Sequence, residues 1–157
     1  MKNVTLFWVS LLFLLAACSN APAQGYNPKA GYDPTIKDVS ILQLITNPQA
    51  YDNAKVRFIA YLRLEFEGNG LYLHREDYEN GISQNAIWVD EPRGLTKEQR
   101  EQVNNRYVIC AGTFRASGHG HMGLFSGELA DVTRLSPWPS RTELEKLRVS
   151  DQKEVPH

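Results

Sequence analysis

The sequence predicts a mainly β protein, in which five short antiparallel strands form a small barrel with short helices around it. Every second residue from Val56 to Phe66 is apolar, which is the pattern of a long strand with one buried face. The Gly-Asn-Gly run at 68–70 supplies a tight hairpin turn directly after it. The predicted elements run helix, three strands, helix, two strands over roughly 100 residues, enough for one core without a metal or disulfide.

The first element is a helix before strand one, predicted over 38–47. Its apolar residues stand at 39, 41, 42, 44 and 45, which places them on one helical stripe. We expect Asp38 to cap its N-terminus and Pro48 to end it.

Three strands and a polar excursion follow this helix. Strand one covers 56–66, strand two covers 71–74 and strand three covers 86–89. Residues 75–85, between the second and third strands, are polar, and we expect a solvated loop there. The acidic run in this segment, HREDYENG, lacks the ligand spacing of an EF-hand calcium loop.

The last part of the chain carries two capping-box patterns and two strands. The pattern at 96–99 predicts a short helix to about residue 104, between strands three and four. Strand four covers 107–114 and strand five covers 124–135. The pattern at 140–143 predicts a short C-terminal helix.

This order of elements resembles the OB-fold, a five-stranded Greek-key barrel with a helix between strands three and four. The resemblance implies an OB-like β domain over 35–136, followed by a C-terminal helix and tail over 137–157. Another small antiparallel sheet with helices on one side is the alternative. The segment from Leu64 to Asp90 is also similar to one in small uncharacterised bacterial envelope proteins, which implies a strand, a hairpin and a strand but no activity.

The N-terminus predicts export and lipidation. Lys2 precedes an uncharged apolar run from Val4 to Leu15, too short to span a bilayer and suited to a signal peptide. The run ends in Leu-Ala-Ala-Cys at 15–18, which resembles the lipobox of bacterial lipoproteins. The resemblance implies a signal peptide over 1–17 and a lipid anchor on Cys18. An ordinary cleaved signal with a chance cysteine is the alternative.

The lipoprotein resemblance also implies a location in the cell envelope. Residues 18–34 are rich in Pro, Gly, Asn and Ala and read as a flexible tether behind the lipid. Ser19 stands where an aspartate would retain a lipoprotein in the inner membrane. We therefore expect an anchor in the outer membrane, with the protein facing the periplasm.

The charge balance argues against a nucleic-acid partner. Without residues 1–17 the chain has 16 of its 17 Lys and Arg against 18 Asp and Glu, a net charge near −2. Such a surface gives no electrostatic reason to bind nucleic acid.

Two histidines in a glycine-rich stretch are candidates for a metal site. His119 and His121 are two residues apart, so on an extended backbone their side chains would point the same way. Together with His74 or a nearby acid they would suit zinc or copper. The alternative is a flexible connection between strands, with no metal or other cofactor.

A second candidate site is the outward face of the predicted sheet. Its members alternate with the apolar positions of their strands, so we expect them on the side away from the core. Aromatic and arginine side chains on one face suit a ligand or protein partner. The alternative is that the helices or the C-terminal segment cover this face. The members are Arg57, Tyr61, Arg63, Tyr72 and Trp88.

The function that the sequence favours is a lipid-anchored, non-enzymatic binding module for a protein or an envelope ligand, of an accessory or immunity type. No nucleophile elbow or nucleotide-binding loop is present, which favours binding over catalysis. A small metal carrier or metal-dependent enzyme using His119 and His121 is the first alternative. An OB-type nucleic-acid binder is the second.

Overall fold

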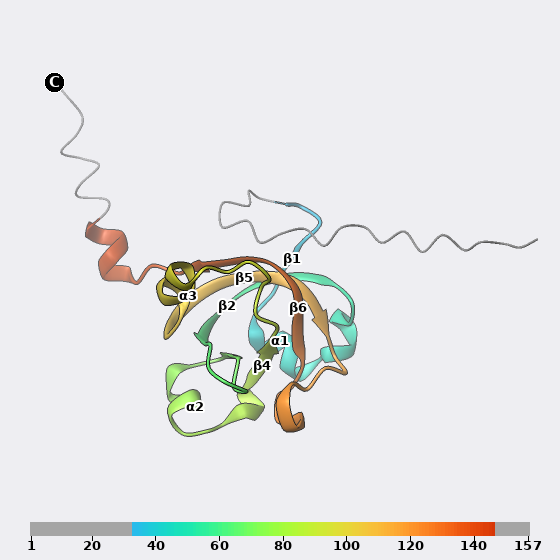
Figure 1. The fold of residues 1–157 in the computed structure, drawn as a ribbon. Helices are drawn as coiled ribbons and strands as arrows, with labels where there is room; N and C mark the ends of the chain where they lie inside the picture. The colour runs from blue at the N-terminus through green and yellow to red at the C-terminus, as the bar shows by residue number, and fades with distance from the viewer. Residues whose placement is uncertain (1–32, 147–157) are drawn as a thin grey trace, which may run out of the picture.

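Five strands close into a small OB-like barrel, as the sequence predicts (Figure 1). The computed structural model describes residues 33–146. Around the barrel the strands lie in the order β2-β3-β4-β6-β5, and β5 pairs with β2 to complete the ring. The strands are β2 (Lys55–Arg63), β3 (Gly70–Tyr72), β4 (Ala86–Val89), β5 (Arg106–Arg115) and β6 (Glu128–Pro137).

One pairing in the barrel is parallel. Neighbouring strands run antiparallel at β2–β3, β3–β4, β5–β6 and β2–β5, but β4 and β6 run in the same direction. A closed ring with an odd number of strands cannot reverse direction at every pairing, so one pairing must be parallel. In this barrel it sets Trp88 opposite Glu128 and Val89 opposite Leu129.

The alternating apolar residues of β2 fill the barrel, as predicted. The side chains of Val56, Phe58, Ala60 and Leu62 are each at most 2% exposed. The alternation ends sooner than the sequence suggests, because β2 stops at Arg63 and the chain turns away from the barrel. Phe66, which was expected on the buried face, is 91% exposed.

The first helix begins later than predicted. α1 covers Ile41–Thr46, and Ser40 caps it in a reciprocal box with Gln43. Asp38, the predicted N-cap, instead lies in a short strand, β1 (Lys37–Asp38), which pairs in parallel with β2. Its carboxylate accepts hydrogen bonds at 2.6 and 2.7 Å from the Arg57 guanidinium and is not free to cap a helix.

The other capping boxes form as predicted. Thr96 caps α3 (Lys97–Val103), which lies between β4 and β5 and places Val103 in the core. Ser140 and Glu143 exchange hydrogen bonds at the start of a helical turn over 141–146, the last described residues. No helix within 33–146 is long and apolar enough to cross a bilayer. The predicted signal peptide, Cys18, most of the tether and the tail after 146 lie outside the described residues.

The polar excursion between β3 and β4 is more structured than the solvated loop that was expected. It contains α2 (Arg75–Glu79) and the 3-10 turn η2 (Ser83–Asn85). Asp77 is buried and accepts hydrogen bonds from the His74 backbone N–H at 3.0 Å and from the Asn85 amide at 2.9 Å. Two further 3-10 turns complete the described elements, η1 (Pro48–Tyr51) and η3 (His121–Gly123).

Candidate functional site

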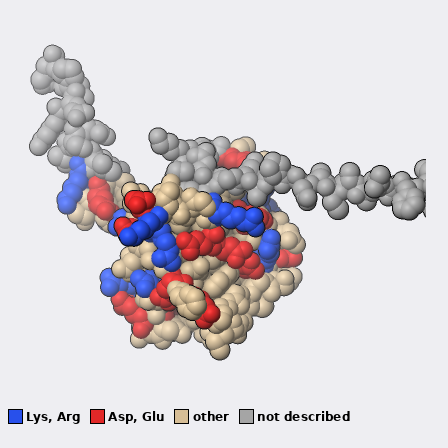
Figure 2. Space-filling model, in the orientation of Figure 1, with Lys and Arg blue, Asp and Glu red and all other residues tan. Residues whose placement is uncertain are grey.

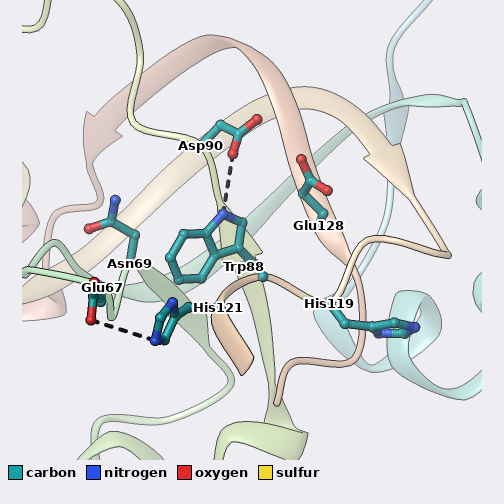
Figure 3. Close-up of a pocket in the computed structure, with 8 residues that line it drawn as sticks. Glu67, Asn69, Trp88, Asp90, His119, His121 and Glu128 are labelled. Atoms are coloured by element: carbon teal, nitrogen blue, oxygen red, sulfur yellow. Dashed lines mark hydrogen bonds and ion pairs between the residues drawn. The ribbon is translucent and has the colours of Figure 1, made fainter. Parts of the chain in front are cut away.

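The described surface has an open hollow on the outside of the barrel, beside β4. Two loops form its sides: residues 64–69 connect β2 to β3, and residues 116–127 connect β5 to β6. The hollow has a volume of about 650 Å³. Figure 3 shows its lining residues, which are Glu67, Asn69, Trp88, Asp90, His119, Gly120, His121 and Glu128.

Trp88 forms the centre of the hollow. It projects from β4, and its indole Nε1 donates a hydrogen bond to Asp90 Oδ1 at 3.2 Å (Figure 3). The Phe125 ring meets it edge to face, with ring centroids 5.4 Å apart. Gly120 passes so close to the indole that a Cβ at this position would overlap the ring. The hydrogen bond, the aromatic contact and the close approach of Gly120 together restrict the orientation of the indole.

Two carboxylates stand together beside Trp88. The parallel pairing of β4 and β6 sets Glu128 opposite Trp88, within hydrogen-bonding reach of Asp90. Burial raises the pKa of the Glu128 carboxyl, and the negative charge and hydrogen bond of Asp90 raise it further. The Arg115 guanidinium, 3.6 Å from Glu128, opposes the increase. The two carboxyl groups therefore share a partly desolvated position, in which ionisation of Glu128 is disfavoured.

The two histidines do not point the same way, contrary to the expectation from their spacing. The chain between them is not extended, because Gly120 has φ +59°. His119 Nδ1 lies 2.8 Å from the Phe125 carbonyl oxygen, so its ring is tied to its own loop. His121 Nε2 lies 3.5 Å from Glu67 Oε2 across the hollow. Figure 3 shows the two rings directed apart.

The third predicted metal ligand is elsewhere. His74 precedes α2 and is not among the residues that line the hollow. Over the described range, no three His, Cys, Asp or Glu side chains come together as metal ligands. What the structure brings together is one histidine and one carboxylate, His121 and Glu67, which join the tips of the two loops.

The predicted outward face is largely covered. Tyr61 and Tyr72 are 3% and 5% exposed, because Tyr78 from α2 and Phe125 from the β5–β6 loop pack against their rings. Strand parity placed both tyrosines correctly on the side away from the barrel interior. It could not show that segments from two loops would return to cover them.

The arginines of that face are also engaged. Arg57 is buried and paired with Asp38. The Arg63 guanidinium lies over the Tyr78 ring, 4.5 Å from its centroid, and pairs with Glu65 at 3.0 Å. Of the five predicted residues, Trp88 is the one that lines the hollow.

The sequence reasoning missed several residues that line the hollow, among them Asn69, Gly120 and Glu128. Glu128 is the one with the most chemical consequence. Nothing near it in the chain marks it, and it comes next to Trp88 through the single parallel pairing of the barrel. Gly118 on the β5–β6 loop was also missed, and it lies so close to Glu128 that a Cβ there would overlap the Glu128 side chain.

The comparisons with known proteins show no family and no function for this chain. No protein-family description matches this chain, and no curated protein matches it. Among solved structures, a DUF3299 family protein from Pseudomonas aeruginosa superposes with a TM-score of 0.41 at 14% identity. That match covers 59% of this chain and 66% of the other, just under two thirds. The S. pombe Stn1–Ten1 complex gives a TM-score of 0.37 at 15% identity, over 80% of this chain and 98% of the other.

Proposed function

We propose that this chain is a lipid-anchored envelope protein that acts as a non-enzymatic binding module, with the hollow around Trp88 as its binding site. The observation that carries the proposal is the lining itself. An indole held in one orientation stands beside Asp90 and Glu128, with Glu67 on the rim. An aromatic ring with adjacent carboxylates suits a ligand that brings an apolar surface together with hydrogen-bond donors or positive charge.

The place of the hollow in the fold supports this choice. OB-folds bind their ligands on the face of strands two and three, between the loops that join strands one to two and four to five. In this barrel those loops are 64–69 and 116–127, which form the sides of the hollow. This support is an analogy of fold, and the choice of ligand rests on the side chains.

The same side chains oppose the nucleic-acid alternative. Nucleic-acid sites in OB barrels combine aromatic platforms with a positively charged groove. The acidic residues here would repel a phosphate backbone at the point where its bases would have to stack. Figure 2 shows acidic side chains gathered in the middle of the face over β6.

The lipid anchor is proposed from the sequence. The Leu-Ala-Ala-Cys run at 15–18 is the basis for an anchor on Cys18, and Ser19 favours the outer membrane. Residues 19–32 would then connect the barrel to the bilayer. An anchored binding module of this size would meet its partner at the periplasmic surface of that membrane.

Photo-crosslinking in the host cell tests the binding site. A benzoylphenylalanine at Phe66, which is 91% exposed beside the hollow, is expected to trap one partner on illumination. The matched control is the same group at Trp138, an exposed aromatic position that follows the far end of β6. A crosslink from position 66 and none from position 138 supports the proposal. Equal trapping from both positions, or none from 66, contradicts it.

A further inference from the structure

We propose that the occupant of the hollow is a basic segment of a protein, in which one arginine or lysine side chain enters the hollow and apolar neighbours cover its rim. The inference rests on the proposed function, because it names the partner of that same site. Three features carry it: exposed apolar side chains on both loops, the backbone that presents them, and the charge between them.

Large apolar side chains stand exposed on both sides of the hollow. Phe66 is 91% exposed, and Met122 and Leu124 on the opposite loop are 78% and 48% exposed. Phe66 adjoins Glu67 and Met122 adjoins His121, and the Glu67 and His121 side chains are 3.5 Å apart, so both apolar residues lie where the two loops approach each other. A single exposed apolar residue needs no explanation, but a group on facing loops marks an interaction surface.

The backbone at both loop tips is held in an unfavourable conformation. Glu67 and Met122 are not glycines, yet each has φ +57°. This left-handed region is unfavourable for a residue with a side chain, because its Cβ crowds the following carbonyl oxygen. Such residues persist where the surrounding structure compensates, and they gather at ligand-binding loops. The fold therefore maintains this cost at the two points that flank the hollow.

The charge of the hollow selects the chemistry of the partner. Its lining contains the carboxylates of Glu67, Asp90 and Glu128. Arg115 lies 3.6 Å from Glu128 but also 3.6 Å from Asp131, so it is shared between two acids. An incoming guanidinium would pair with the Asp90 and Glu128 carboxylates in its planar, two-pronged geometry and lie beside the Trp88 indole.

The combination favours a protein over a small cation. A small cation would leave the apolar side chains on the rim exposed to water. Phe, Met, Trp and Arg are the side chains enriched at the centres of protein interfaces. A peptide segment of the pattern apolar, basic, apolar satisfies both parts: the basic residue enters the hollow, and its neighbours cover Phe66 and Met122.

A peptide titration tests the inference. The chain from Cys18 to His157, which has Trp88 and Trp138 as its two tryptophans, is labelled with ¹⁵N at tryptophan, held in zwitterionic detergent micelles and titrated with acetyl-Ala-Leu-Arg-Leu-Ala-amide. Trp88→Phe identifies the Trp88 indole signal. We expect that signal to shift saturably, with the Trp138 signal as an internal reference. The peptide with citrulline in place of arginine has the same shape without charge, and we expect it to bind at least 10-fold more weakly.

Three double variants test separately how the charge of the hollow and the apolar side chains on its rim contribute to peptide binding. E67Q/E128Q keeps the bond between Trp88 and Asp90 and is expected to weaken the arginine peptide at least 10-fold. E98Q/E101Q on α3 makes the same charge change away from the hollow, and we expect no change in affinity. F66S/M122S is expected to weaken both peptides several-fold, because each loses its apolar contacts.

The outcomes distinguish this inference from the proposed function. Equal binding of the arginine and citrulline peptides, undiminished binding to E67Q/E128Q, or a saturable Trp88 shift with a thymidine oligonucleotide would each overturn it. A crosslink from position 66 that traps a segment with no Lys or Arg near the crosslink would support the proposed binding site and contradict the inference of a basic partner. If the crosslink and the peptide shift both fail, both proposals are wrong.

Discussion

The side chain of Asn104 forms two hydrogen bonds with the backbone of Leu64, forty residues earlier in the chain. The Leu64 N–H donates to Asn104 Oδ1 at 2.8 Å, and Asn104 Nδ2 donates to the Leu64 carbonyl at 3.0 Å. The amide thus takes the place of a neighbouring strand at the point where β2 has ended. Since Leu64 begins the loop that carries Glu67 and Phe66, this contact sets the start of one side of the hollow.

Replacement of Asn104 by alanine should therefore destabilise the barrel. The Leu64 side chain is 2% exposed, and its backbone N–H and carbonyl would both lose their partner. We expect a loss of about 1–3 kcal/mol in the free energy of unfolding, measured by urea denaturation. Asn80→Ala is the matched control, because its amide donates to a helix carbonyl at an exposed position. Equal costs for the two variants would show that the contact with Leu64 contributes nothing particular.

Gly120→Ala should cost more than Gly123→Ala. Gly120 has φ +59° and ψ −158°, a region that essentially only glycine adopts, whereas Gly123 has a positive φ of +70°. An alanine therefore has a conformational cost at both positions and a larger one at 120. A Cβ at 123 would meet nothing within 4 Å, whereas at 120 it would overlap the Trp88 ring. We expect Gly120→Ala alone to shift the Trp88 fluorescence and indole NMR signal. Identical unfolding curves for the two variants would contradict the packing of this loop on the indole.

Glu128→Gln should stabilise the protein more as the pH rises. Burial and Asp90 raise the pKa of Glu128 in the folded state, so the wild-type protein loses stability as pH rises through that raised pKa. A glutamine does not ionise and avoids the loss. We expect the unfolding free energy of the variant, relative to wild type, to increase from about pH 4 to pH 7 in urea titrations.

Glu98→Gln is the control of opposite sign. A hydrogen bond from its own backbone N–H, aided by Thr96, lowers the pKa of Glu98, so its contribution is lost as the pH falls through that lowered pKa. This variant should therefore be less stable than wild type at neutral pH and approach it in acid. The same pH trend for both variants would refute the assignment of Glu128 as a carboxyl held near a second negative charge.

The lipid anchor gives a prediction that separates the two cysteines. A clickable palmitate fed to the host should label the wild-type chain and place it in the outer-membrane fraction. Cys18→Ala should abolish both, because it removes the acylated thiol. Cys110→Ala should retain both, since Cys110 is fully buried in the barrel. Labelling that survives in Cys18→Ala would contradict the anchor.

The sequence predicted the fold well because its strongest signals are local. The alternation in β2 and the two later capping boxes each need only a few adjacent residues to be read. The predicted tight turn at 68–70 was wrong: the connection covers 64–69, Gly70 belongs to β3, and Glu67 has the positive φ. The first helix shows the limit of a prediction made from adjacent residues alone. Asp38 and Ser40 are both good caps, and Asp38 is excluded only because Arg57 holds its carboxylate.

The sequence by itself determined the fold class, the five strands of the barrel, their approximate bounds and which side of each strand faces inward. Only the tertiary structure decided the site. Tyr61 and Tyr72 became core because Tyr78 and Phe125 return from distant loops to cover them. Trp88 and Glu128 became neighbours because a closed five-stranded ring requires one parallel pairing, here β4 with β6. Local periodicity records which side of a strand a residue occupies, but the closure of the barrel determines what that side meets.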